Sequence, residues 1–294
     1  MRFFLKFILL MPLIIFSDQE QNIYEISYGE HKKQKIDFYK GTSDKVLVWI
    51  HGGGWLYGDK RAGRWIQRFQ NHFVDHKKFN VFMIGYRIGD STAPDAVNDV
   101  ICAYKKIVEE ALQRDLSTND IVIAGASAGG HLALMIGLKR DKENKNCMLI
   151  RKPKAVINLF GITDIEETAK FLDETKFFKA SNYVRRWIPA ELTLKEASKK
   201  LSPIYYIDDN APNVLSIHGT ADRWVPYNQA ILIANSLGNS HDLLTIDGGG
   251  HYFFSDTEDE QVRLKISEFL ENKLSLINIS EPTRRRGYRI TTYK

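Results

Sequence analysis

The stretch that decides the fold is IVIAGASAGGHLALMIGL, which occupies residues 121–138. Residues 121–124 form a short apolar run that predicts a buried strand, and residues 131–138 form an apolar run that predicts a helix. Between them lies GASAG, centred on Ser127. In a G-x-S-x-G turn from strand to helix, the serine hydroxyl stands exposed at the carboxyl end of the strand, near the positive end of the helix. This context indicates that Ser127 is a nucleophile, and a purely structural turn is the alternative.

Short apolar runs of the same kind recur on both sides of this stretch and alternate with helical patterns. The runs lie at residues 46–50, 81–84, 155–160, 214–217 and 243–246, and helical spacing occurs at 94–112, 228–237 and 259–270. Strands that are apolar on both faces are typical of a parallel sheet covered by helices. The sequence therefore predicts an α/β fold with one mostly parallel, doubly wound sheet in a single domain of residues 18–273. Residues 162–210 break the alternation, and we predict that they form a helical insertion over the site, which could serve as a lid.

A glycine-rich loop, HGGGW at residues 51–55, directly follows the apolar run at 46–50. Successive glycines let backbone N–H groups turn toward a ligand without obstruction by side chains. Acyl transfer needs such donors, because a negatively charged oxygen develops in its tetrahedral intermediate. We therefore expect the amides of Gly53, Gly54 and Ala128 to form an oxyanion hole. A flexible turn is the alternative interpretation of this loop.

An acid and a base follow two later strands. Asp222 comes shortly after the run at 214–217, and His251 follows the run at 243–246 through three glycines. Serine, acid and histidine then occur in the chain order of the α/β-hydrolase fold. Because the carboxyl ends of parallel strands meet at one edge of a sheet, we expect Ser127, Asp222 and His251 to lie together as a catalytic triad.

Other histidines and carboxylates compete for these two roles. His218 precedes the acid in the chain, and His241 precedes the last strand, so it is expected at the opposite end of the sheet. We predict that His51 orients the glycine loop rather than accepting a proton. Asp247 ends the same strand that leads to His251 and cannot easily turn back toward it. His251 and Asp222 remain the best base and acid.

Aromatic side chains in the predicted site loops are candidates for an apolar substrate pocket. These residues are Trp55, Tyr57, Trp224 and Tyr252. An apolar pocket of this kind would hold an acyl or aryl group. Packing within the core or the loops is an equally good interpretation of each of them.

The two ends of the chain differ from the body in composition. Residues 1–17 combine a positive start with a short apolar run before an abrupt polar switch, which predicts a signal peptide, a product that is secreted or kept in the lumen of the secretory pathway, and no stable membrane span. An uncleaved anchor helix is the alternative interpretation. Residues 274–294 are basic and aperiodic, which predicts a disordered tail.

Charge and cysteine content narrow the classes of partner and compartment. The last fourteen residues carry a net charge of +4 and the first seventeen +2, out of a total of +5, which leaves about −1 for the body. We therefore expect no nucleic-acid partner. Cys102 and Cys147 could form a disulfide in an oxidising compartment, or Cys102 could be a free buried thiol in a helix.

Taken in combination, these motifs resemble a known family. HGGGW followed by GDK, YR, GASAGGH, HGTADRWVP and GGGHYFF resembles the α/β-hydrolase fold-3 lineage, and is most similar to secreted esterases of the bifunctional-deacetylase and feruloyl-esterase-like group. The resemblance spans residues 46–270 and implies the same triad and oxyanion hole. The loop after Tyr86 and Arg87 departs from the more regular proline-rich loop of many relatives, so the shape of their acyl pocket does not carry over.

The sequence thus predicts a serine esterase that hydrolyses a small-molecule carboxylic ester through an acyl-enzyme, with no metal or cofactor. Two alternatives remain open. Arylformamidases share the HGG-x-W pattern and the triad, so the motifs do not separate ester from formamide. A secreted binding protein that keeps the fold without the activity is the other.

Overall fold

The computed structural model describes residues 23–61, 73, 78–139, 147, 151–175, 182–252 and 255–274. The predicted signal peptide and all but the first residue of the predicted tail lie outside these ranges. Within them, no helix combines the length and the apolar character needed to cross a membrane.

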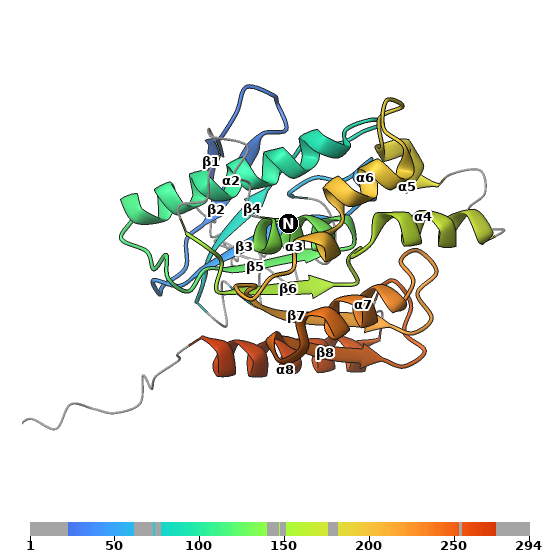
Figure 1. The fold of residues 1–294 in the computed structure, drawn as a ribbon. Helices are drawn as coiled ribbons and strands as arrows, with labels where there is room; N and C mark the ends of the chain where they lie inside the picture. The colour runs from blue at the N-terminus through green and yellow to red at the C-terminus, as the bar shows by residue number, and fades with distance from the viewer. Residues whose placement is uncertain are drawn as a thin grey trace, which may run out of the picture.

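A single sheet runs through the described part of the chain, and Figure 1 shows its strands in succession from β1 in blue to β8 in orange. The strand order is β1-β2-β4-β3-β5-β6-β7-β8. β2 pairs antiparallel with β1 and β4, and every other pairing in the sheet is parallel. The strands are β1 (Ile23–Ser27), β2 (Lys35–Tyr39), β3 (Val46–Ile50), β4 (Asn80–Ile84), β5 (Val122–Ala126), β6 (Ala155–Leu159), β7 (Asn213–Gly219) and β8 (His241–Ile246).

The predicted fold class is confirmed, and the two strands that sequence reasoning missed are β1 and β2. Their side chains include Glu25, Lys35 and Asp37 among apolar neighbours, so neither strand reads as a continuous apolar run. Asp37 is fully buried and pairs with Lys60 and Arg61. These ion pairs offset the cost of burying its carboxylate in the hairpin.

Both faces of the central strands are buried, because helices cover each side. In β3, Val46, Val48 and Ile50 join one hydrophobic cluster, whereas Leu47 and Trp49 join the other. The first cluster packs under α2 (Ala93–Gln113), α3 (Ala128–Leu138) and α7 (Asn228–Leu237), and the second packs under α8 (Asp256–Lys273). A short 3-10 turn, η4 (Gly238–Ser240), follows α7. Because successive side chains of a central strand enter the two clusters in turn, every position of such a strand is buried, and the strand is an uninterrupted apolar run in the sequence.

The segment predicted as an insertion contains α4 (Ile165–Glu174), α5 (Tyr183–Trp187), α6 (Leu194–Leu201) and the 3-10 turn η3 (Pro203–Tyr206). Figure 1 shows these helices on the side of the molecule toward which β5 and β6 point. Side-chain caps fix their starts: Asp164 accepts from the Glu167 amide, and Thr193 forms a capping box with Glu196. The insertion is therefore built from short, well-capped helices.

Cys102 and Cys147 form a disulfide, a pairing that the sequence left open. Cys102 lies in α2, so the bond ties Cys147 to that helix.

Candidate active site

Ser127 occupies a strained turn between β5 and α3. Its backbone has φ 57° and ψ −122°, a conformation that L-residues rarely adopt and that clusters at functional sites. The glycines on either side are required by close backbone contacts. A Cβ on Gly125 would lie 2.2 Å from the Gly129 carbonyl oxygen, and a Cβ on Gly129 would lie 2.2 Å from that of Ile50. The turn thus holds the serine at the carboxyl end of β5, beside the end of β3.

A chain of hydrogen bonds joins the three side chains predicted as a triad. His251 Nε2 lies 3.1 Å from Ser127 Oγ, and His251 Nδ1 lies 2.7 Å from Asp222 Oδ2. All three residues are largely buried. With the proton on Nδ1 donated to Asp222, the lone pair of Nε2 faces the serine hydroxyl and can accept its proton.

Asp222 accepts hydrogen bonds at both carboxylate oxygens. Its Oδ1 accepts from the amides of Trp224 at 2.8 Å and Val225 at 3.0 Å, and His218 Nε2 lies 3.3 Å from its Oδ2. Burial by itself opposes ionisation, but the hydrogen bonds from His218, His251 and the Val225 amide outweigh it and hold the pKa of Asp222 well below its usual range. The acid therefore carries its negative charge wherever the histidine can act as a base.

Backbone contacts between two neighbouring turns bring the acid and the base together. The Thr220 amide donates to the Ile246 carbonyl, and the Ala221 amide donates to the Gly249 carbonyl at 2.9 Å. A Cβ on Gly219 would lie 2.2 Å from that same Gly249 oxygen. The turns after β7 and β8 consequently pack directly on each other, which sets the distance between Asp222 and His251.

The glycine loop after β3 lies against the nucleophile turn. A Cβ on Gly52 would lie 2.7 Å from the Ala126 carbonyl oxygen. Gly53 and Gly54 have φ of 112° and 58°, in the region that favours glycine, and both line the same pocket as Ser127. Ala128 is the first residue of α3, so its N–H has no partner within the helix. Gly53 and Gly54 thus lie on the same pocket as Ser127, and Ala128 directly follows Ser127 at the start of α3.

His51 hydrogen-bonds the backbone of the glycine loop, which fits the orienting role predicted for it. Its Nδ1 lies 2.8 Å from the Gly52 carbonyl oxygen, and its ring stacks on Tyr86 with centroids 4.4 Å apart. Burial lowers the pKa of His51 to about 4, so the ring is neutral at physiological pH.

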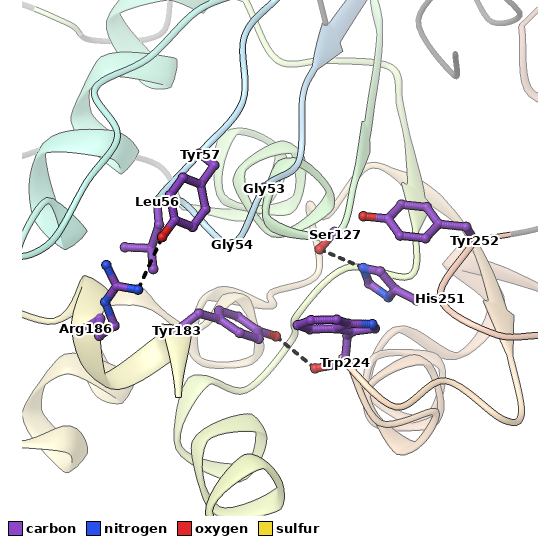
Figure 2. A pocket seen from close by; sticks show the side chains of 10 residues that line it. All are labelled: Gly53, Gly54, Leu56, Tyr57, Ser127, Tyr183, Arg186, Trp224, His251 and Tyr252. Carbon is purple, nitrogen blue, oxygen red and sulfur yellow. Dashed lines mark hydrogen bonds between the residues drawn. The ribbon is translucent and has the colours of Figure 1, made fainter. Parts of the chain in front are cut away.

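A pocket of about 370 Å³ opens at Ser127 and His251. Figure 2 shows Arg186 and Tyr57 at one end, His251 and Tyr252 at the other, and Gly53 and Gly54 between them. The residues that line it are Gly53, Gly54, Leu56, Tyr57, Ser127, Tyr183, Arg186, Trp224, His251 and Tyr252.

Three of the four predicted pocket residues, Tyr57, Trp224 and Tyr252, line this pocket, but Trp55 does not. The prediction for Trp55 is wrong because its side chain is fully buried beneath the loop, stacked on Trp187 at 4.0 Å between ring centroids. An aromatic residue next to a glycine loop can point toward the pocket or toward the core. Trp55 points toward the core, where its ring packs on Trp187 of α5.

Tyr183 and Arg186 are pocket residues that sequence reasoning missed. Both come from α5, in the segment for which the sequence predicts only a helical insertion. Five residues are too short a helix to show a helical period, so the sequence carries no signal that these two side chains face the site.

His131 and His241 form hydrogen bonds that stabilise the fold. His131 Nε2 lies 2.7 Å from the Leu201 carbonyl oxygen, which ties α3 to the end of α6, and burial lowers the pKa of His131 to about 4. His241 starts β8 and hydrogen-bonds Ser216 Oγ at 2.9 Å. In the part of the chain that the structure describes, no group of three or more His, Cys, Asp or Glu side chains could hold a metal ion.

Comparison with known proteins identifies the family. The family described as BD-FAE matches residues 36–237, more than half of the chain. The chain belongs to the BD-FAE family. This confirms the family that the motifs indicated, whereas secretion stays a prediction.

Curated relatives of this BD-FAE chain include an esterase and a formamidase. Esterase LipC of Mycobacterium tuberculosis is 26% identical over 247 residues, covering 78% of this chain and 59% of the relative. Kynurenine formamidase of Salmo salar is 29% identical over 121 residues, covering 40% of this chain and 38% of the relative. The chain thus spans about three-fifths or less of the length of these relatives.

Solved structures of esterases share the fold of this BD-FAE chain. A bifunctional GH43-CE protein of Bacteroides eggerthii matches with a TM-score of 0.69 and 29% identity, covering 85% of this chain and 35% of that one. Esterase 2 of Thermogutta terrifontis, phosphonylated by sarin, matches with a TM-score of 0.68 and 22% identity, covering 85% and 95%. The second likeness concerns the fold alone.

Proposed function

We propose that this BD-FAE chain is a serine esterase that hydrolyses small-molecule carboxylic esters, with Ser127 as nucleophile, His251 as base and Asp222 as the acid that orients it. The observation that carries the proposal is the continuous hydrogen-bonded path from Asp222 through His251 to Ser127, which ends in an open pocket. The esterase relatives support the same reaction class.

The proposed reaction uses these groups in two half-reactions. His251 Nε2 removes the proton of Ser127 as its oxygen attacks the ester carbonyl, and Asp222 stabilises the imidazolium that forms. The amides of Gly53, Gly54 and Ala128 stabilise the oxyanion. His251 then protonates the departing alkoxide, which leaves the acyl group on Ser127. Water activated by His251 hydrolyses this acyl-enzyme and restores the serine.

The decisive test compares substitutions of the nucleophile and of two histidines. We expect Ser127→Ala and His251→Ala each to lower kcat for 4-nitrophenyl butyrate by about 10⁶, and the double variant to be little worse than either, because the residues act as a unit. His241→Ala is the control and should lose far less, since His241 lies at the start of β8, where its ring hydrogen-bonds Ser216 of β7. Near-normal turnover by the Ser127 variant would refute the assignment.

Formamide hydrolysis is the second candidate, and the kynurenine formamidase relatives favour it. The same groups would attack an N-formyl carbon and protonate a departing amine. Rates on phenyl formate and N-formylaniline derivatives, which share the formyl group, distinguish the two, because an esterase turns over the first much faster. A non-catalytic binding protein would hydrolyse neither and would not be labelled by a fluorophosphonate probe.

We also propose that the protein acts outside the reducing cytosol. The disulfide between Cys102 and Cys147 supports this, since such bonds persist mainly in oxidising compartments. N-terminal sequencing of the exported protein tests the accompanying prediction of cleavage near Ser17.

A further inference from the structure

Two neighbouring arginines on α5 have different surroundings. Arg185 pairs with Asp173 at 2.6 Å and does not line the pocket. Arg186 pairs with Asp90 at 2.9 Å and lines the pocket that holds Ser127. The same short helix therefore carries one arginine directed to the site and one directed away from it.

Arg186 is held in place so that one edge of its guanidinium remains available to a ligand. Its Nε and Nη2 both contact Asp90 Oδ1, while Nη1 points to the Tyr57 hydroxyl at 3.4 Å, a long and weak hydrogen bond. Its backbone is fixed too, because the Ser91 amide donates to the Arg186 carbonyl at 2.9 Å. Asp90 thus orients the cation and leaves its Nη1 edge facing the pocket.

The charge around the pocket favours an anion at this end. Among the described residues that line it there is no Asp or Glu, and Arg186 is the only Lys or Arg. Asp222 lies behind His251, and Figure 2 shows His251 and Arg186 at opposite ends of the pocket. The side chain of Asp90 is 61% exposed, so water screens its charge more strongly than it would screen a group inside the pocket.

The position of His251 indicates which half of an ester would reach Arg186. His251 must protonate the departing alkoxide, so the alcohol leaves from the end of the pocket formed by His251 and Tyr252. Arg186 lies at the other end, beyond Gly54. The acyl half of the ester, which stays on Ser127, is therefore the half that extends toward Arg186.

We propose that Arg186 binds a carboxylate at the far end of the acyl group, so that the preferred substrates are monoesters of dicarboxylic acids. This inference rests on the proposed esterase function and names its substrate class. The carboxylate would receive a charge-assisted hydrogen bond from Nη1, with the Tyr57 hydroxyl as a second donor.

The test uses a pair of substrates that differ only in the charge of the acyl end. These are mono-4-nitrophenyl adipate and its methyl-capped form, methyl 4-nitrophenyl adipate, and the measured quantity is the ratio of their kcat/KM values. We expect Arg186→Met to lower this ratio about tenfold, which is what a charge-assisted hydrogen bond of about 1.4 kcal/mol provides. Arg186→Lys should retain part of the preference, and 0.5 M NaCl should weaken it.

Arg185→Met is the matched control and should leave the ratio at the wild-type value, because Arg185 does not line the pocket. An unchanged ratio in a folded Arg186→Met protein would overturn the proposal. A second pair, 4-carboxyphenyl butyrate and its methyl ester, carries the charge on the alcohol half. If Arg186→Met affects only that pair, the assignment to the acyl half is wrong.

Failure of the esterase function itself has a different signature. In that case the wild type would not hydrolyse neutral 4-nitrophenyl butyrate at all. The anion site is then tested by binding: monomethyl adipate should raise the melting temperature of Ser127→Ala more than dimethyl adipate does, and the difference should vanish in Ser127→Ala/Arg186→Met. Equal effects of the two ligands on Ser127→Ala would overturn the anion site.

Discussion

The Asp222 carboxylate is contacted by two histidine side chains, and one of them, His218, lies outside the proposed triad. His218 is fully buried in β7, and its Nε2 lies 3.0 Å from the Val225 carbonyl oxygen and 3.3 Å from Asp222 Oδ2. A donor to a carbonyl must carry the proton, so Nε2–H also faces the acid. His218 is therefore a positioning residue for Asp222 rather than a rival base.

The first prediction at this scale concerns that contact. We expect His218→Leu to lower kcat for 4-nitrophenyl butyrate by about tenfold with little change in KM, because Asp222 loses a donor worth about 1.5 kcal/mol. His218→Gln should recover most of the loss, since a glutamine amide can place its N–H where Nε2 stands. Equal kcat values for the two variants, both folded by circular dichroism, would show that the contact has only a packing role.

The proximity of Ser127, Asp222 and His251 could be predicted residue by residue, whereas the lining of the pocket could not. Ser127, Asp222 and His251 each follow a strand whose apolar run is visible in the sequence, and parallel strands bring their carboxyl ends to one edge. The direction of a loop side chain has no such rule. Trp55 turns into the core and Arg186 turns into the pocket because of contacts with distant segments, with Trp187 in one case and Asp90 in the other.

The β5–α3 unit depends on glycines that let the backbones of β5, α3 and the end of β3 approach one another closely. A Cβ on Gly129 would lie 2.2 Å from the Ile50 carbonyl and 2.5 Å from that of His51, so α3 would have to move away from β3. The carbonyls at the end of β3 cannot retreat, because that strand is paired on both sides by β4 and β5.

The prediction for this element is that Gly129→Ala lowers the free energy of unfolding by about 1–3 kcal/mol, the usual cost of overpacking a core. Urea unfolding followed by tryptophan fluorescence measures it. Gly250→Ala provides the control, because a Cβ there meets nothing within 4 Å, and its midpoint should stay close to that of the wild type. Comparable losses in both variants would mean that the close approach at Gly129 is not what makes it necessary.

The parallel sheet could be predicted because burial on both faces makes each of its central strands a continuous apolar run. The hairpin β1–β2 could not, since its strands mix charged and apolar residues and are recognisable only by the pairing of β1 with β2 and of β2 with β4. The insertion was visible as a break in the alternation, but its helices could not be placed. α5 is too short for a period, and α6 has a polar face and is held through His131 and Leu201.

Two histidines are buried in their neutral form, and we expect them to lower the free energy of unfolding in acid. His51 and His131 are both largely or fully buried, and burial lowers the pKa of each to about 4 from 6.5. The unfolded chain binds a proton at these two sites at a pH near 6.5, whereas the folded chain does so only near 4. Folding is therefore unaffected by them above pH 6.5, and stability is lost progressively as the pH falls from 6.5 toward 4.

We expect each histidine to cost on the order of 3 kcal/mol over that interval, since one unit of pKa corresponds to about 1.36 kcal/mol. The measurement is the urea midpoint between pH 7 and pH 4.5 for the wild type and for His131→Gln, which cannot titrate but can still donate to the Leu201 carbonyl. The urea midpoint of His131→Gln should be equal to or below that of the wild type at pH 7 and should fall less steeply as the pH is lowered. The control is His31→Gln, at an exposed position, whose midpoint should follow the wild-type curve. Asp222 contributes little to this decline. Its pKa is lowered from 3.8 in the folded protein, so the stability that it provides is lost mainly as the pH falls below 3.8. A slope in His131→Gln as steep as that of the wild type would mean that acid destabilises the protein through other groups.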